Sequence, residues 1–445
     1  MRWKGPALAL LGAAAVAVIA IVFTLGKGGS SSVETQGPNG PGATGTGNSS
    51  STGTTGTTGT TTGPTTGTTN ENPGPTRPGH RLLVATVDDG VKQPDPGSAL
   101  DLMRISHDAG FDAVMVSSMW KTGAKAPSAE ERLTLGNVVK AAAAENMRVF
   151  VFVWHGLSGA TPRTVGARKQ FAAYAAGLAR AFPQIRDFVI GNEPNLNTFW
   201  MPQFGPGGKD VAATAYLDLL ARTYDALKAV SPNIQVVGGA LAPRGSDRPK
   251  LRRDTHSPTQ FIKDLGAAYR ASGRSTPVMD AFAMHPYMRT SDLSPTDTHA
   301  DSTTITIADY GKLTTLLARA FAGTRQQGRG LPIYYTEFGV QTKIPTAHRR
   351  AYTDLGSPAA ADAVDPQTQA LYYEEALELA ACQPTVRGLF VFHTFDEPDL
   401  AGWQSGLYYA DRKPKPSLPA FRTAAAAARA ARLTRCAGTT FVHIE

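Results

Sequence analysis

Short apolar runs alternate along the chain with longer stretches in which apolar residues recur at helical spacing. Unbroken apolar runs are typical of strands buried on both faces of a parallel sheet. The predicted strands occupy residues 81–87, 111–117, 146–154, 188–190, 234–239, 278–284, 331–336 and 386–392. Predicted helices include 98–109, 128–145, 164–181, 211–230 and 418–432. Eight strands alternating with eight helices predict an α/β fold, a closed (β/α)8 TIM barrel.

An open, doubly wound sheet is the alternative fold for this alternation. Such a sheet usually carries a glycine-rich phosphate-binding turn after an early strand, and the sequence has no such turn. No internal repeat at a solenoid period is present either. The barrel is therefore the favoured prediction.

The N-terminal part of the chain differs in composition from the rest. Residues 7–25 are almost wholly apolar and follow Arg2 and Lys4, a pattern long enough to cross a bilayer with its N-terminus in the cytoplasm. An uncleaved signal anchor over 1–27 is favoured over a cleaved signal peptide, which would have a shorter apolar stretch and a small-residue cleavage site. Residues 28–79 are rich in Thr, Gly and Ser, which predicts a disordered linker. Residues 80–445 form the predicted folded domain.

Both interpretations of the N-terminal segment place the folded domain outside the cell, either anchored to the membrane or secreted. In that compartment Cys382 and Cys436 are expected to form a disulfide, with two buried free thiols as the alternative. The formal net charge of +8 is spread along the chain without a basic helix or an aromatic-interleaved patch. Nucleic acid is therefore not an expected partner.

Polar and aromatic residues gather where the predicted strands end, which is the face where such barrels carry their active sites. The fourth strand ends in Asn192 and Glu193, and the seventh is followed by Glu337. Other ends supply Trp154 and His155, then His285 and Tyr287, then His393 and Phe395. We therefore expect two carboxylates to face one another across a mouth lined by imidazole, phenol and indole groups.

Paired carboxylates of this kind suit the cleavage of a glycosidic bond. One carboxyl group protonates the leaving oxygen, and the other, ionised, attacks the sugar or activates water. A carboxyl group partly removed from water holds its proton closer to neutral pH, as a general acid must. The rings of Trp154, Trp120 and Phe395 suit stacking on sugar faces, and for each of them simple packing is an equal alternative.

Two motifs resemble the signatures of the clan A glycoside hydrolases, which are retaining (β/α)8 enzymes. They are GNEPN at 191–195, after the fourth predicted strand, and YTEFG at 335–339, after the seventh. Their order and spacing make the chain similar to families 5 and 39 in particular.

This resemblance implies a glycan substrate, no cofactor and a monomeric catalytic domain at 80–445. It implies that Glu193 is the acid/base and Glu337 the nucleophile. Asn192 would bond the sugar 2-hydroxyl, and Tyr287 would orient Glu337. The residues His155 and His285 would line the subsite at the cleavage point.

The sequence departs from the clan's pattern at two strand ends. The clan commonly carries a tryptophan after strand eight, where this chain has Phe392 and His393, and an arginine after strand two, where it has Ser117 and Ser118. Both departures leave the identity of the sugar open.

Two other classes of function compete with this interpretation. One is a glycan-binding protein that keeps the barrel and has lost turnover. The other is a metal-dependent hydrolase that uses His155, His285 and His393 with the glutamates, but no His-x-His or His-Glu-x-x-His spacing supports it. For His393 alone we expect a hydrogen-bonded wall of the pocket.

The loops after strands four to seven, at 195–209, 242–257, 288–302 and 341–365, are longer than a minimal barrel needs. They are expected to wall the cleft. Two of them are basic: one carries Arg244, Arg248, Lys250, Arg252 and Arg253, and the other carries Lys343, His348, Arg349 and Arg350. An anionic group on the glycan, such as a uronic acid, is one explanation, and solvated loop charge is the alternative.

Overall fold

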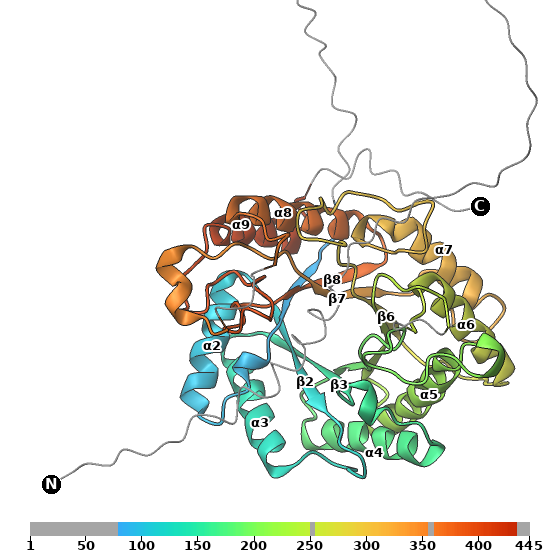
Figure 1. Cartoon of the computed structure of the whole chain (residues 1–445). Helices are drawn as coiled ribbons and strands as arrows, with labels where there is room; N and C mark the ends of the chain where they lie inside the picture. The colour runs from blue at the N-terminus through green and yellow to red at the C-terminus, as the bar shows by residue number, and fades with distance from the viewer. Residues whose placement is uncertain (1–78, 250–253, 355–359, 434–445) are drawn as a thin grey trace, which may run out of the picture.

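The computed structural model describes residues 79–249, 254–354 and 360–433. In this part of the chain eight parallel strands close into a barrel in the order β1 to β8. The barrel closes where β8 pairs with β1, from Leu83 opposite Gly388 to Val87 opposite Phe392. Helices surround the barrel in Figure 1. The predicted TIM barrel is confirmed.

The strands are β1 (Leu83–Val87), β2 (Ala113–Met119), β3 (Arg148–Trp154), β4 (Asp187–Ile190), β5 (Gln235–Leu241), β6 (Ala281–Met284), β7 (Ile333–Phe338) and β8 (Val386–Phe392). The helices around them are α2 (Pro96–Ala109), α3 (Ala129–Ala144), α4 (Val165–Ala181), α5 (Ala212–Val230), α6 (Pro258–Ala271), α7 (Tyr310–Ala320), α8 (Pro366–Cys382) and α9 (Leu418–Arg429). One boundary matters for function. The seventh strand runs past the predicted end at 336, so Glu337 is a residue of β7 itself.

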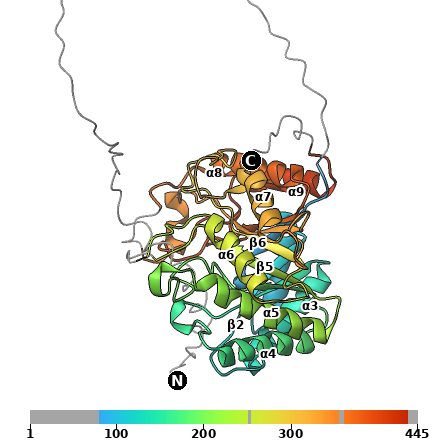
Figure 2. The same cartoon turned by 90° about the vertical axis from the view of Figure 1, so that its right-hand side faces the viewer.

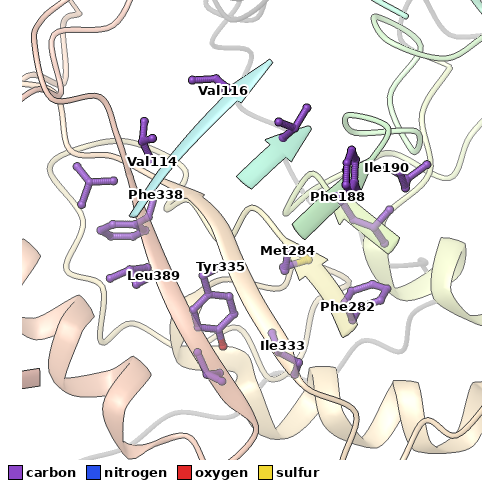
Figure 3. Packing of buried hydrophobic residues seen from close by; sticks show 14 of the residues in the cluster. Val114, Val116, Phe188, Ile190, Phe282, Met284, Ile333, Tyr335, Phe338 and Leu389 are labelled. Carbon is purple, nitrogen blue, oxygen red and sulfur yellow. The ribbon is translucent and has the colours of Figure 1, made fainter. Parts of the chain in front are cut away.

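Two apolar layers hold the barrel together, because successive side chains of a strand point to opposite faces. In β3, Phe150, Phe152 and Trp154 belong to a cluster inside the barrel. Val151 and Val153 belong instead to the larger cluster between strands and helices. Figure 3 shows members of that outer layer, among them Ile190 at the end of β4. Burial on both faces explains why the strands appear as unbroken apolar runs in the sequence.

Local capping fixes where several helices begin, at the face where the strands end. The side chains of Ser128, Thr164, Ser257 and Asp365 each accept a hydrogen bond from the backbone N–H three residues later. Such caps satisfy N–H groups that have no partner inside the helix. The loops that reach the mouth of the barrel therefore have firmly defined ends.

A buried ion pair anchors the long loop between β8 and α9. Lys415 Nζ lies 2.7 Å from Asp396 Oδ1, and both side chains are fully buried. The same ammonium group donates to Thr342 Oγ1 at 2.7 Å and to the carbonyl of Gln404 at 3.0 Å. Because all three acceptors lie in the loops after β7 and β8, this lysine joins those loops at the mouth.

Some predictions fall on residues outside the described part of the chain. The signal segment at 1–27, nearly all of the linker at 28–79 and Cys436 lie there, so the predicted anchor and disulfide stay predictions. Within the described ranges, no helix has the length and apolarity that a bilayer crossing requires.

Candidate active site

Glu193 lies in a constrained turn directly after β4. Its φ angle is 39°, in the left-handed region that non-glycine residues rarely adopt. Its N–H donates to the carbonyl of Ala240 at 2.9 Å. Gly191 in the same turn has a φ of 82°, and a Cβ there would come within 3.0 Å of the Tyr216 ring. The turn is thus held from β5 and α5, and Glu193 is only 1% exposed.

Glu337 faces the same mouth from β7. The hydroxyl of Tyr287 donates to its Oε2 at 3.2 Å, as the family resemblance implies. Burial raises the pKa of Glu337 to about 7. The neighbouring His285 counters this effect, and the carboxylate of Glu193 adds to it. The two glutamates therefore share one electrostatic environment.

His285 lies between the two carboxylates. Its Nδ1 is 3.1 Å from Glu193 Oε1 and 3.5 Å from Glu337 Oε2. Burial acts to lower the pKa of His285, but the two carboxylates outweigh it and hold the pKa above its usual value. One ligand atom from each of the three residues lies within 4.8 Å of the others. The structure thus brings the predicted acid/base, the predicted nucleophile and a predicted subsite histidine into one cluster.

Buried polar atoms at the ends of β3 and β4 have no hydrogen-bond partner among the described residues. They are Glu193 Oε2, Trp154 Nε1 and His155 Nδ1. Burial lowers the pKa of His155 to about 4, so its ring is neutral at physiological pH. Leaving a buried polar group unpaired costs about 1–3 kcal/mol. A polar ligand that supplied the missing hydrogen bonds would recover this free energy.

The end of β8 forms another wall of the mouth. His393 Nδ1 lies 2.6 Å from the carbonyl of Val87, and Nε2 lies 3.2 Å from Glu397 Oε1. Although burial acts to lower it, the carboxylates of Glu397 and Asp88 raise the pKa of His393 to about 9. His393 is therefore a hydrogen-bonded, positively charged residue at the end of β8.

A cavity of about 500 Å³ opens beside the ends of β1 and β8. Its lining includes Asp88, Asp89, Phe152, His393, Phe395 and Glu397. Glu193 and Glu337 are not among the lining residues, but the charge of His393 acts on Glu337. The cavity is thus next to the glutamate cluster and within the size range of ligand pockets.

The predicted aromatic residues differ in their surroundings. Trp120 is 1% exposed, packs edge-on against Phe171 and donates to the carbonyl of Ala124, so its role is packing. Trp154 is buried inside the barrel mouth, and Phe395 is half-buried on the cavity wall against Tyr408. Asn192, beside Glu193, is 8% exposed.

Trp403 is a site residue that the sequence analysis missed. It belongs to the loop after β8, where its ring centroid lies 5.1 Å from that of Tyr287 and 5.8 Å from that of Phe392. The indole therefore packs on the tyrosine that bonds Glu337. The strand end itself lacks the tryptophan that the family pattern predicts there, and no local signal shows that a residue 11 positions after Phe392 folds back.

Tyr216 was missed as well, whereas Arg244 was named only as a basic residue of the loop after β5. The hydroxyl of Tyr216 donates to the carbonyl of Ile190 at 2.8 Å and accepts from the N–H of Gly239 at 2.7 Å. It therefore joins the ends of β4 and β5. In the sequence, Tyr216 cannot be distinguished from the many other apolar positions of its helix. Arg244 donates to the carbonyl of Tyr287 at 3.4 Å. Burial lowers the pKa of Arg244, and the negative charge of Glu193 partly offsets this effect. Of the other basic loop residues, Arg252 and Arg253 lie outside the described part of the chain.

The cluster of Glu193, His285 and Glu337 also offers donor atoms that a metal ion accepts. The other two histidines of the predicted metal alternative, His155 and His393, do not belong to this cluster.

No protein-family model and no curated protein matches this sequence. Among solved structures, the chain resembles a family 39 glycoside hydrolase from Bacteroides cellulosilyticus WH2, with a TM-score of 0.53 and 21% identity over 78% of this chain and 64% of that one. It also resembles a glucosidase from Croceicoccus marinus, with a TM-score of 0.50 and 13% identity over 79% and 69% of the two chains. A family 5 structure (GH5_18) from Streptomyces cattleya has a TM-score of 0.49 and 17% identity over 79% and 80%.

The likeness to clan A barrels expected from the two motifs is confirmed at the level of the fold by the family 39 structure from Bacteroides cellulosilyticus WH2. The chain spans 64% of the length of the family 39 structure from Bacteroides cellulosilyticus WH2.

Proposed function

We propose that this protein is a retaining glycoside hydrolase that cleaves O-glycosidic bonds of a polysaccharide or oligosaccharide. The observation that carries the proposal is the separation of the two glutamates. A carboxylate oxygen of Glu193 lies within 4.8 Å of one of Glu337. Retaining enzymes hold their carboxyl groups about 5–5.5 Å apart, whereas inverting enzymes leave about 6.5–9.5 Å for a water molecule.

The surroundings of the two carboxyl groups support different roles for them. Glu337 accepts a hydrogen bond from the hydroxyl of Tyr287 and lies near the imidazole of His285. Donors of this kind stabilise a carboxylate, as a nucleophile requires. Oε2 of Glu193 has no hydrogen-bond partner among the described residues, so it is open to bond the leaving oxygen of a ligand.

Two displacements follow from these roles. In the first, an oxygen of Glu337 attacks the anomeric carbon, the glycosidic bond breaks, and the leaving oxygen takes the proton of Glu193. In the second, water attacks the anomeric carbon, Glu193 takes a proton from that water, and the bond to Glu337 breaks. Sugar hydroxyls would supply hydrogen bonds to Asn192, Trp154 and His155. The cavity beside His393 would hold a further part of the glycan.

A 2-fluoro aryl glycoside tests the proposal, because the fluorine slows the second displacement and leaves the sugar attached. A panel of such glycosides identifies the sugar, and peptide mass spectrometry identifies the modified residue. We expect the label on Glu337, no label in Glu337→Gln, and normal labelling in the exposed-glutamate control Glu130→Gln. Binding without labelling or turnover would instead establish a glycan-binding protein. Turnover that leaves no label on Glu337 and is abolished by a chelator would establish a metal-dependent hydrolase.

We also propose that the enzyme acts outside the cell, attached through residues 7–25. The apolar length of this segment and the basic residues before it support this location. Fractionation of cells that express the full chain, followed by protease treatment of intact cells, tests it. Recovery of the chain in the cytosolic fraction would refute the proposal.

A further inference from the structure

A second cluster of titratable side chains lies in the wall of the mouth, at the start of two neighbouring helices. Asp210 caps the start of α5, where its Oδ1 accepts the N–H of Ala213 at 2.9 Å. His256 comes two residues before α6, and Asp264 lies within α6. Figure 2 shows α5 and α6 side by side. One ligand atom from each of the three residues lies within 4.8 Å of the others.

Two members of this cluster, Asp210 and His256, have buried and incompletely bonded side chains, whereas Asp264 is half-buried and accepts a hydrogen bond from Gln260 at 2.9 Å. The side chains of Asp210 and His256 are 5% and 2% exposed. Asp210 Oδ2 and His256 Nδ1 have no hydrogen-bond partner among the described residues. Each such buried atom costs about 1–3 kcal/mol when nothing binds it. Loop geometry alone does not explain why two of them lie in one cluster.

The cluster also carries negative charge that no basic side chain neutralises. Among the described residues, neither Asp210 nor Asp264 forms an ion pair with a lysine or arginine. Two carboxylates this close to each other require either a shared proton or a cation between them.

The geometry points to a cation, and we propose that Asp210, His256 and Asp264 bind a divalent transition-metal ion of the zinc class. His256 Nε2 lies 3.4 Å from Asp210 Oδ1. Two ligands that bind zinc at about 2.0–2.2 Å in a tetrahedron lie roughly 3.4 Å apart. The imidazole excludes a calcium-type site, since calcium takes oxygen ligands. On the far edge of the ring, Nδ1 lies 3.9 Å from Asp247 Oδ1, which is too long for a hydrogen bond. His256 Nε2 also lies 3.2 Å from the carbonyl oxygen of Gln203, a contact that a metal ion between the two atoms would replace.

The position of the cluster gives the ion a structural role next to the active site. The N–H of His256 donates to the carbonyl of Asn195 at 2.9 Å, and the Asn195 side chain donates to the carbonyl of His256 at 3.0 Å. Asn195 follows Glu193 by two residues. A metal bound to His256 would therefore brace the loop that carries Glu193. The binding site does not depend on what that loop catalyses.

Zinc content and melting temperature test the site in the full chain, purified without a polyhistidine tag. The parent protein carries Glu337→Gln, which removes one donor of the other cluster. After incubation with zinc chloride and dialysis, we expect one zinc ion per chain by mass spectrometry. At a hundredfold excess over Kd, zinc should raise the melting temperature by about 3–6 °C. The same concentration of magnesium chloride should leave it unchanged.

Asp264→Asn in this background should lower the zinc content at least tenfold and abolish the shift. The matched control is Asp225→Asn, which removes an exposed carboxylate that pairs with Arg274 and should leave both readouts intact. Equal zinc content in the two variants would overturn the proposal. A melting temperature that does not respond to zinc in the parent protein would overturn it as well, and would assign a shared proton to the two aspartates. The melting-temperature measurement uses only the parent protein, so it does not depend on whether a variant folds.

Discussion

The hydrogen bond from Tyr287 to Glu337 sets the lower pH limit of activity in the proposed mechanism. Its donor lies 3.2 Å from Glu337 Oε2 and stabilises the ionised carboxylate. Burial already raises the pKa of Glu337 to about 7, so activity that requires its ionised form is lost as the pH falls below this value. Tyr287→Phe removes the donor and keeps the ring that packs on Trp403. The pKa of Glu337 must then rise further.

The size of the effect follows from the strength of the bond. A hydrogen bond to a charged group contributes about 1.5–3 kcal/mol, and a distance of 3.2 Å favours the lower end. At about 1.36 kcal/mol per pKa unit, the acid limb should move upward by about one unit. At a pH one unit below the midpoint of the acid limb, kcat/KM of the variant should be about tenfold lower than that of the native protein. At alkaline pH the loss should be smaller.

The assay is kcat/KM as a function of pH, measured with the aryl glycoside that the native protein hydrolyses fastest, because this ratio reports the free enzyme. The matched control is Tyr269→Phe, which removes another buried phenol whose hydroxyl donates to the carbonyl of Thr276. It should leave the acid limb in place. An acid limb that stays fixed in Tyr287→Phe, or moves to lower pH, would refute the electrostatic reasoning.

Three further predictions concern other residues of the fold and the site. Glu193→Gln should slow hydrolysis of alkyl glycosides by about 10²–10⁴-fold, and it should slow hydrolysis of aryl glycosides with good leaving groups much less. Equal losses for the two substrates in steady-state assays would show that Glu193 is not the general acid. Lys415→Met leaves the fully buried Asp396 unpaired and should cost about 3–5 kcal/mol in urea unfolding, whereas the exposed Lys413→Met should cost little. Arg244→Gln should lower kcat/KM for a uronate-bearing glycan about tenfold relative to its neutral counterpart, and an unchanged ratio would mean that this arginine does not recognise an anionic group.

Most of the barrel could be predicted from the sequence because strands buried on both faces must be apolar at every position. The predicted strand 386–392 coincides with β8, and the cap at Thr164 marks the start of α4. The end of a strand is harder to predict from sequence where burial continues past the apolar run. Glu337 is polar, yet β7 includes it, since its side chain faces the mouth of the barrel.

Local apolar patterns and strand ends are enough to predict the order of strands and helices and to place Glu193 and Glu337 at the mouth. The separation of the two glutamates, the position of His285 between them and the packing of Trp403 on Tyr287 depend on tertiary contacts. Tertiary contacts also bring Asp210, His256 and Asp264 together. These contacts join residues far apart in the chain, and the paths of the intervening loops depend on packing against the whole barrel. Local sequence patterns therefore do not predict these contacts.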